Sequence, residues 1–206
     1  TLSSSSAASD VYKRQTLRDG VQGEGISFSV EDKLKIAKKL DDLGIHYIEG
    51  GWPGSNPKDI LFFNQVRKLG LRRAKIVAFG STRYKGRRAS DDPNLNTIIE
   101  ARSEAACIFG KSWRLHVKYA LRTSLAENLK MIFDSVKYLK SKGLEVIYDA
   151  EHFFDGYFDD RLYAMETLRQ AANAGADNIS LCDTNGGMMP GPVSYTHLTL
   201  PTKRIV

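Results

Sequence analysis

The stretch TLRDGVQGEG, residues 16–25, places a cation and an anion side by side where glycines make the backbone a poor helix former. In this stretch Arg18 directly precedes Asp19. A carboxylate is a hard oxygen ligand suited to a divalent cation, and a guanidinium can stabilise a developing oxyanion. The same two residues could equally form an ion pair that ties down a loop. Residue types alone leave both readings open.

Five apolar or β-branched runs follow this stretch and are typical of strands. They are HYIEGGW, AKIVAFGS, AACIFGKS, LEVIYDAEHFF and DNISLCDTNGG. Helical segments separate them. Residues 29–44 and 124–143 each begin with a serine N-cap, carry an acidic residue three positions later and end at a glycine, which predicts capped helices. Further helices are predicted from Asn56-Pro57 onward and around Tyr163, ending at Gly175.

The expected inward-facing residues of the first two helices follow a three- or four-residue spacing. They are Val30, Leu34, Ala37, Leu40 and Leu43, and then Leu125, Leu129, Ile132, Val136 and Leu139.

Strand and helix alternate about every 30–40 residues, which favours βαβ units and a parallel sheet. Polar side chains gather where the strands are expected to end: Glu49, Ser81, Lys111, Glu151 and Asp183. That asymmetry favours an α/β fold of the (β/α)8 TIM-type barrel class, whose chemistry lies at the carboxyl ends of the strands. A doubly wound open sheet is the alternative, although the chain has no G-x-G-x-x-G after its first strand. With a first strand ending in TLRDG, about six of eight strands are present, so we expect an incomplete barrel.

Composition places the chain among ordinary globular proteins. It has 206 residues, a formal net charge of +6 and two cysteines, Cys107 and Cys182, which we expect to be reduced and buried in strands. The basic cluster Arg83, Lys85, Arg87 and Arg88 indicates a solvated loop, with an anionic ligand as the alternative. No apolar run is long enough to span a membrane and no signal peptide is evident, so the expected location is cytoplasmic.

Both ends of the chain lack the apolar periodicity of the interior. SSSSAASDVYKRQ and VSYTHLTLPTKRIV resemble translated sequencing-adapter DNA. We therefore expect residues 1–15 and 192–206 to be non-native flanks. Residues 16–191 would form the N-terminal part of a catalytic barrel.

Several motifs together resemble the pyruvate carboxyltransferase, or DRE-type, metal-dependent Claisen condensing barrels. They are TLRDG, YIEGGWPGSNP and LCDTNGG. EGGWPGSNPKD and VIYDAEHFFDGY are most similar to the citramalate synthase branch of that family. The resemblance implies an acyltransferase that condenses acetyl-CoA with a 2-keto acid, pyruvate in this branch. An isopropylmalate-type condensation with a larger keto acid, or a non-catalytic basic binding module, are the alternatives.

The resemblance also implies roles for individual residues. Asp19 matches the metal-binding aspartate, and Arg18 the arginine that polarises the keto oxygen. Glu151 matches a carboxylate implicated in proton abstraction, with its neighbour His152 expected to be structural. The positions that match substrate-binding residues are Gln22, Glu49, His116 and Thr184.

One departure from the family concerns the metal, for which the resemblance implies Mn, Mg or Zn. The family completes this site with a His-x-His on the seventh strand, and the four histidines here form no such motif. Since a catalytic metal ordinarily takes about three protein ligands, we expect this polypeptide to be an inactive fragment. The expected partners are acetyl-CoA and a 2-keto acid, with no nucleic acid and no membrane, and a homodimer at full length.

Overall fold

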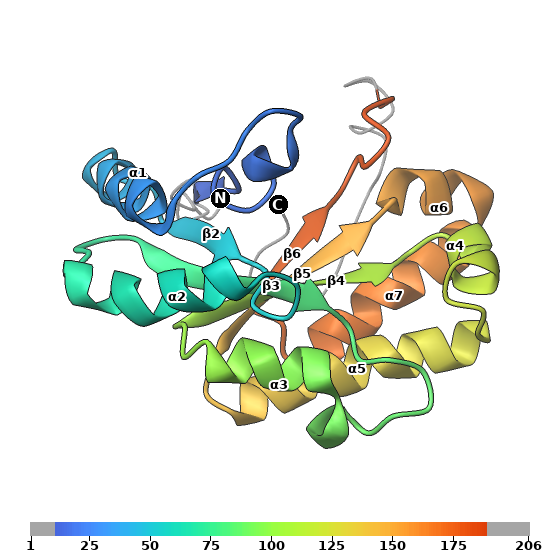
Figure 1. Ribbon diagram of the computed structural model, residues 1–206. Coiled ribbons are helices and arrows are strands. Elements are labelled where there is room, and N and C mark those ends of the chain that lie inside the picture. The colour runs from blue at the N-terminus through green and yellow to red at the C-terminus, as the bar shows by residue number, and fades with distance from the viewer. Residues whose placement is uncertain (1–10, 189–206) are drawn as a thin grey trace, which may run out of the picture.

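Six parallel strands form one curled sheet in the computed structural model, which describes residues 11–188 (Figure 1). The strands are β1 (Lys13–Arg14), β2 (Tyr47–Gly51), β3 (Lys75–Ser81), β4 (Ala105–Lys111), β5 (Glu145–Glu151) and β6 (Asn178–Leu181). Each strand pairs with the next one in the chain. This sequential order confirms an incomplete TIM-type barrel, because a doubly wound sheet reverses its strand order at a switch point.

Helices cover the outer face of the sheet (Figure 1). Within the described residues they are α1 (Val30–Asp42), α2 (Pro57–Val66), α3 (Pro93–Glu100), α4 (Arg114–Tyr119), α5 (Leu125–Ser141), α6 (Phe153–Asp159) and α7 (Arg161–Asn173). Three short 3₁₀ turns complete the set: η1 (Gly20–Gln22), η2 (Arg67–Leu69) and η3 (Ala89–Asp91). In this part of the chain no helix is both long enough and apolar enough to cross a membrane.

The predicted helix starts are confirmed in detail. Ser29 caps α1 by accepting the Asp32 N–H at 3.1 Å, and its own N–H donates to the Asp32 carboxylate at 3.0 Å. Ser124 caps α5 in the same way by accepting the Glu127 N–H. The reciprocal bond expected from Glu127 is not formed, because that carboxylate binds Arg83 instead. The α2 helix begins at Pro57 behind its cap Asn56.

For two residues, Leu43 and Leu125, the predicted inward orientation is wrong. Leu43 is 77% exposed and Leu125 is 37% exposed. Successive steps of three residues each fall about 60° short of a full helical turn, so a stripe continued from Leu34 to Leu43 rotates away from the core. Leu125 is the first residue of α5, where the helix has barely reached the sheet.

The strands bury both faces, as their continuous apolar runs predict. The outer face packs against the helices in the main core, which includes Ile48, Ala78, Ile108 and Tyr148. A smaller core lies on the inner, concave face and consists of Tyr47, Val77, Phe79, Ala105, Cys107 and Ile147. Side chains that alternate along one strand therefore separate into two cores.

The structure corrects the bounds of two predicted strands and adds three short helices. The β5 strand was predicted to continue through HFF, but it ends at Glu151, and His152, with φ +53°, turns the chain into α6. The α3, α4 and α6 helices were not predicted from the sequence. The first strand was expected to end in TLRDG, but it is Lys13–Arg14, inside the segment predicted to be a flank. Most of the two predicted flanks, residues 1–10 and 192–206 with His197, lie outside the described residues.

Other expectations concern single side chains. Both cysteines are free, as predicted, although Cys182 is only partly buried and follows β6 rather than lying in it. The loop that contains Lys85, Arg87 and Arg88 is exposed as expected. Arg83 is an exception, since its side chain is 2% exposed and is bound by Glu127 at 2.8 Å and Asp134 at 2.9 Å. Arg83 therefore links the end of β3 to α5 through the ion pairs of its buried side chain.

Candidate active site

Glu49 binds several polar side chains on the concave face of the sheet. Its side chain, in the middle of β2, is fully buried. Arg18 donates to the carboxylate from Nε at 2.9 Å and from Nη2 at 2.8 Å. Lys13 Nζ lies 2.8 Å from the other oxygen, which also accepts from Gln15 at 3.2 Å. Three side chains from residues 13–18 therefore converge on one carboxylate.

Arg18 is held on three sides. Besides binding Glu49, it donates from Nη1 to Asp19 at 2.9 Å. Its guanidinium carbon lies 3.9 Å from the centre of the Phe79 ring, a cation–π contact. The Asp19 side chain is 58% exposed, whereas that of Arg18 is 12% exposed. The ion pair that the sequence left open is thus formed, and it fixes a guanidinium where a developing negative charge could be stabilised.

Lys13 also contacts two further groups of the concave face. Its Nζ is 3.1 Å from both Asp149 oxygens and 3.3 Å from Cys107 Sγ. A cavity of about 380 Å³ reaches this place and is lined by residues of β1, β5 and β6, Lys13 and Asp149 among them. Two buried carboxylates thus share one ammonium group.

These contacts shift the protonation equilibria of the cluster. Burial disfavours the charged form of Glu49, but Lys13 and Arg18 outweigh it and hold the pKa of Glu49 below its ordinary value. Burial likewise opposes the charge of Lys13, yet the anionic surroundings raise the pKa of Lys13 well above its usual range. Burial, with Asp149 next to it, raises the pKa of the Cys107 thiol. At neutral pH Lys13 is therefore cationic, Glu49 is a carboxylate and Cys107 is a neutral thiol.

One group in residues 11–188 combines three potential metal ligands: Glu49, Cys107 and Asp149, whose ligand atoms lie within 4.8 Å of one another. Lys13 already supplies a positive charge in contact with all three. Asp19, the predicted metal ligand, belongs to no such group in the described part of the chain. The residues present therefore do not by themselves form a metal site at Asp19.

Glu151 is the last residue of β5 and bonds to Lys111, the last residue of β4 and its register partner. Both side chains are largely buried, with 25% and 18% exposed respectively. As predicted, Ser81, Lys111 and Glu151 each end a strand, whereas Glu49 lies within one and Asp183 lies two residues beyond β6. The carboxyl ends of the parallel strands thus carry polar groups at one edge of the sheet.

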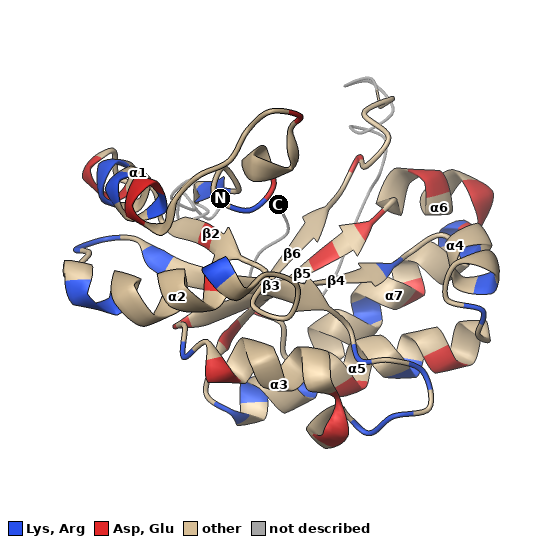
Figure 2. Cartoon of the chain, in the orientation of Figure 1, with Lys and Arg blue, Asp and Glu red and all other residues tan. Residues whose placement is uncertain are grey.

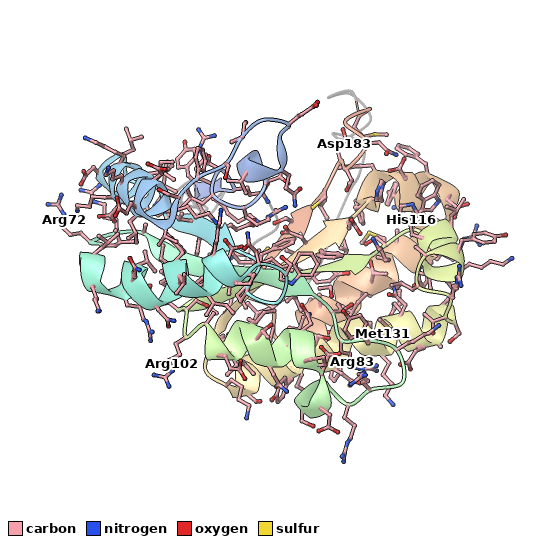
Figure 3. All side chains as sticks on the ribbon, in the orientation of Figure 1. Arg72, Arg83, Arg102, His116, Met131 and Asp183 are labelled. Carbon is pink, nitrogen blue, oxygen red and sulfur yellow. The ribbon has the colours of Figure 1, made fainter. Side chains whose placement is uncertain are left out.

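A second polar group lies at that edge beyond β4, β5 and β6. The rings of His116 and His152 are in edge contact, with centroids 4.4 Å apart, and Trp113 packs against both. The Nδ1 atom of His116 is buried without a partner among the described residues. Burial, then His152 and Lys111, lowers the pKa of His116. Figure 3 shows His116 and Asp183 toward the same end of the molecule.

Both the side chain and the backbone of His152 are held by hydrogen bonds. Its Nδ1 lies 3.0 Å from the Asp155 carboxylate, which also accepts from Asn185 at 2.9 Å. Its backbone N–H donates to Thr184 Oγ1 at 2.9 Å. The structure thus places Thr184 next to the His116–His152 pair. Gln22 is exposed on η1, and no hydrogen bond joins its side chain to these groups within residues 11–188.

Sequence reasoning missed Lys13, Cys107 and Asp149 as site residues. Lys13 belonged to the predicted flank, and Cys107 was read as an ordinary buried thiol. Asp149 did carry a signal, because it precedes Glu151 by two residues in a strand, and that spacing places both carboxylates on one face.

Comparison with known proteins gives relatives over most of the chain. A family profile described as HMGL-like matches residues 12–199. The (R)-citramalate synthase of Geobacter sulfurreducens is 61% identical over 175 residues, which are 85% of this chain and 33% of that protein. The (R)-citramalate synthase of Sulfolobus acidocaldarius is 56% identical over 178 residues, 86% of this chain and 34% of that protein. The 2-isopropylmalate synthase of the same organism is 32% identical over 176 residues, which are 85% of this chain and 42% of that protein.

Solved structures agree on the fold. The HMG-CoA lyase of Brucella melitensis superposes with a TM-score of 0.68 at 18% identity, covering 91% of this chain and 66% of that one. The chain spans about a third of the length of the citramalate synthases it matches. Because the profile match extends over nearly all of the sequence, from residue 12 to residue 199, the chain belongs to the HMGL-like family.

Proposed function

We propose that the protein to which this chain contributes is an acyltransferase that condenses acetyl-CoA with pyruvate to (R)-citramalate. The observation that carries the proposal is the difference in sequence identity to two enzymes of one organism. Over nearly the same segment, the chain is 56% identical to the citramalate synthase of Sulfolobus acidocaldarius and 32% identical to its 2-isopropylmalate synthase. The activity belongs to the longer protein, and we expect the 206-residue chain alone to be inactive.

The proposed reaction assigns Glu151 and Arg18 as catalytic residues. An ionised Glu151 accepts a proton from the acetyl-CoA methyl group, and the resulting enolate carbon attacks the keto carbon of pyruvate. The keto oxygen becomes an alkoxide, whose charge the guanidinium of Arg18 stabilises before the oxygen is protonated. Water then hydrolyses the thioester, which releases coenzyme A and citramalate. The contacts of Arg18 with Glu49 and Phe79 support this role, because they fix the guanidinium before the charge develops.

Four residues are proposed to act on substrate by binding. Thr184 accepts the His152 N–H through its oxygen, so its own hydroxyl proton is free to donate to the carboxylate of the keto acid. His116 offers the unpartnered Nδ1 to the same region. Glu49 acts through Arg18, which it orients. Gln22 lies on η1, directly after the Arg18–Asp19 pair, and is proposed to contact the acyl-CoA.

The proposal for Asp19 is that it contributes one ligand to a divalent ion, Mn, Mg or Zn, in the longer protein. Such an ion, when bound, polarises the carbonyl of a keto acid. The described residues supply only Asp19 there, so no step above depends on the ion. By the same family resemblance, we place the protein in the cytoplasm, in isoleucine or leucine synthesis, as a homodimer at full length.

A chimaera tests the proposal. Residues 16–191 would replace the matching segment of the Geobacter sulfurreducens enzyme, which is 61% identical there. Coenzyme A release is then measured with pyruvate and with branched or longer 2-keto acids. We expect preference for pyruvate, and we expect Arg18→Ala to reduce kcat about 100-fold or more while leaving the fold intact.

Preference for a larger keto acid would replace the proposal with an isopropylmalate-type reaction. A folded chimaera that releases no coenzyme A, but retains nucleic acid in a salt-sensitive manner, would favour a basic binding module.

A further inference from the structure

A hollow of about 510 Å³ lies at the amino-terminal ends of β3 and β4. Its walls come from the end of α2, from the connection into β3 and from residues 101–104 before β4. The residues described above as the candidate active site lie elsewhere, toward the carboxyl ends of the strands. Figure 3 shows Arg72 and Arg102 on the side of the molecule away from His116 and Asp183. The hollow is therefore a separate site.

The walls of this hollow are strongly basic. Five cationic residues line it, with Glu104 as the acidic residue among them: Arg67, Arg72, Arg73, Lys75 and Arg102. Figure 2 shows basic residues at the end of α2 and in the connection to β3. Two of the five are neutralised, because Arg72 pairs with Asp42 at 3.2 Å and Lys75 pairs with Glu145 at 2.6 Å.

The other three arginines have no ion pair within residues 11–188. Arg67 donates only to the neutral amide of Asn64, at 3.1 Å. No hydrogen bond or ion pair of the described chain involves the guanidinium groups of Arg73 and Arg102, and both residues are exposed. Three arginines in the lining of one hollow thus have no ion pair within residues 11–188, and Glu104 is the one acidic residue in that lining. Elsewhere on this chain, cations such as Lys13, Arg18 and Arg83 are paired with acids.

The floor of the hollow is apolar. Its lining includes Phe63 and Val66 of α2, Ala74 and Ile76 at the start of β3, and Ala101 at the end of α3. These side chains are buried parts of the main core, so the floor is rigid. A rigid apolar floor beneath a charged rim suits a ligand that has both an apolar body and an anionic group. The volume lies within the range of small-molecule sites, about 300–1,000 Å³.

We propose that this hollow binds a small phosphate-bearing molecule with an apolar part, of the nucleoside phosphate class. Guanidinium groups bind phosphate oxygens through paired N–H donors, and Arg67, Arg73 and Arg102 offer three such groups. The apolar floor takes the body of the ligand. Side chains, and not a glycine-rich loop, make this site. The inference does not depend on the proposed synthase activity.

Binding to the full 206-residue chain tests the proposal by calorimetry at low salt. The probes are ATP, inorganic pyrophosphate, which has only the anionic part, and adenosine, which has only the apolar part. We expect ATP to bind more tightly than a Kd of about 1 mM, pyrophosphate to bind about tenfold more weakly, and adenosine more weakly still. No ATP binding at that concentration, or equal binding of adenosine and ATP, would overturn the proposal.

Variants locate the site. Arg73→Ala and Arg102→Ala should each weaken ATP binding about tenfold. Arg73→Lys keeps the positive charge but loses the paired N–H donors of the guanidinium group, and it should weaken binding by less. Arg87→Ala is the matched control, because Arg87 is also exposed and has no ion pair in the described residues. Circular dichroism confirms that each variant is folded. A loss of affinity in Arg87→Ala as large as in Arg73→Ala would mean diffuse charge attraction and would refute the site.

Discussion

Replacing Lys13 by methionine should destabilise the protein by about 3 kcal/mol at pH 7. Lys13 Nζ contacts Glu49 and Asp149, whose side chains are 0% and 6% exposed. Removing one partner of a buried ion pair costs about 3–5 kcal/mol, because an uncompensated charge stays in a medium that solvates it poorly. Methionine fills a similar volume, so packing contributes little to the loss.

The two carboxylates should not share this cost equally. Glu49 keeps Arg18 at 2.8 Å and Gln15 at 3.2 Å after the substitution. Asp149 has Lys13 as its only cationic partner within residues 11–188. Most of the penalty therefore arises at Asp149, and the expected loss lies at the lower end of the range. The double variant Lys13→Met/Asp149→Asn should recover most of the stability. Lys13→Met/Glu49→Gln should not, because it leaves Asp149 without a cation and removes the buried partner of Arg18.

Urea unfolding followed by far-UV circular dichroism measures these differences. With a slope of about 2 kcal/mol/M, the midpoint of Lys13→Met should fall by about 1.5 M. The wild type should itself lose stability as the pH falls from the ordinary pKa of a glutamate through the depressed pKa of Glu49, where this carboxylate becomes protonated. A loss below about 1 kcal/mol would refute the assignment of a buried, charged cluster.

Further outcomes follow from single contacts. A Cβ on Gly156 would lie 2.3 Å from the Ser112 carbonyl oxygen, so Gly156→Ala should cost about 3 kcal/mol in urea unfolding; Gly143→Ala, with φ +82° but open space, should cost only about 1 kcal/mol. Ser29→Ala should cost about 1 kcal/mol in the same assay and Ser29→Asn much less, because asparagine retains an oxygen acceptor for the helix cap. The ring protons of His116 should titrate by NMR with a midpoint below 6.5, and the stability contributed by its neutral form should be lost as the pH falls from about 6.5 toward that midpoint; a midpoint above 6.5 would contradict its burial.

Much of the fold could be read from local signals. Five of the six strands were predictable from their apolar runs. The four long helices were predictable because caps such as Ser29 and Asn56 and terminal glycines such as Gly44 act within a few residues. The α3, α4 and α6 helices are six to eight residues long, which gives too few turns for a periodic pattern. The α6 helix also follows β5 through His152 in a left-handed conformation, which the sequence HFFDG does not signal.

The sequence indicates which strand residues belong to the candidate site, but not which residues contact one another there. Glu49, Lys111 and Glu151 follow from the position of polar residues in apolar runs. That Lys111 binds Glu151, however, depends on the register of β4 against β5, and that Asp155 orients His152 depends on how α6 leaves the strand. Both are tertiary facts with no counterpart in local sequence. The three arginines of the hollow that lack an ion pair within residues 11–188 come from η2, the connection into β3 and the turn after α3, and only the fold brings them together.

The shortness of β1 explains why two cations and one amide converge on Glu49. A strand of two residues, with Lys13 beside Tyr47 and Arg14 beside Ile48, forms too few backbone hydrogen bonds to set its own register. The contacts of Lys13, Gln15 and Arg18 with one buried carboxylate of β2 supply the missing constraint. A slip of the segment by one residue would turn Lys13 away from the concave face and separate Arg18 from Glu49. The buried carboxylate therefore positions Arg18 as well as binding it, and Glu49→Gln should loosen the whole segment from residue 13 to residue 18, seen as faster amide exchange there than in β3.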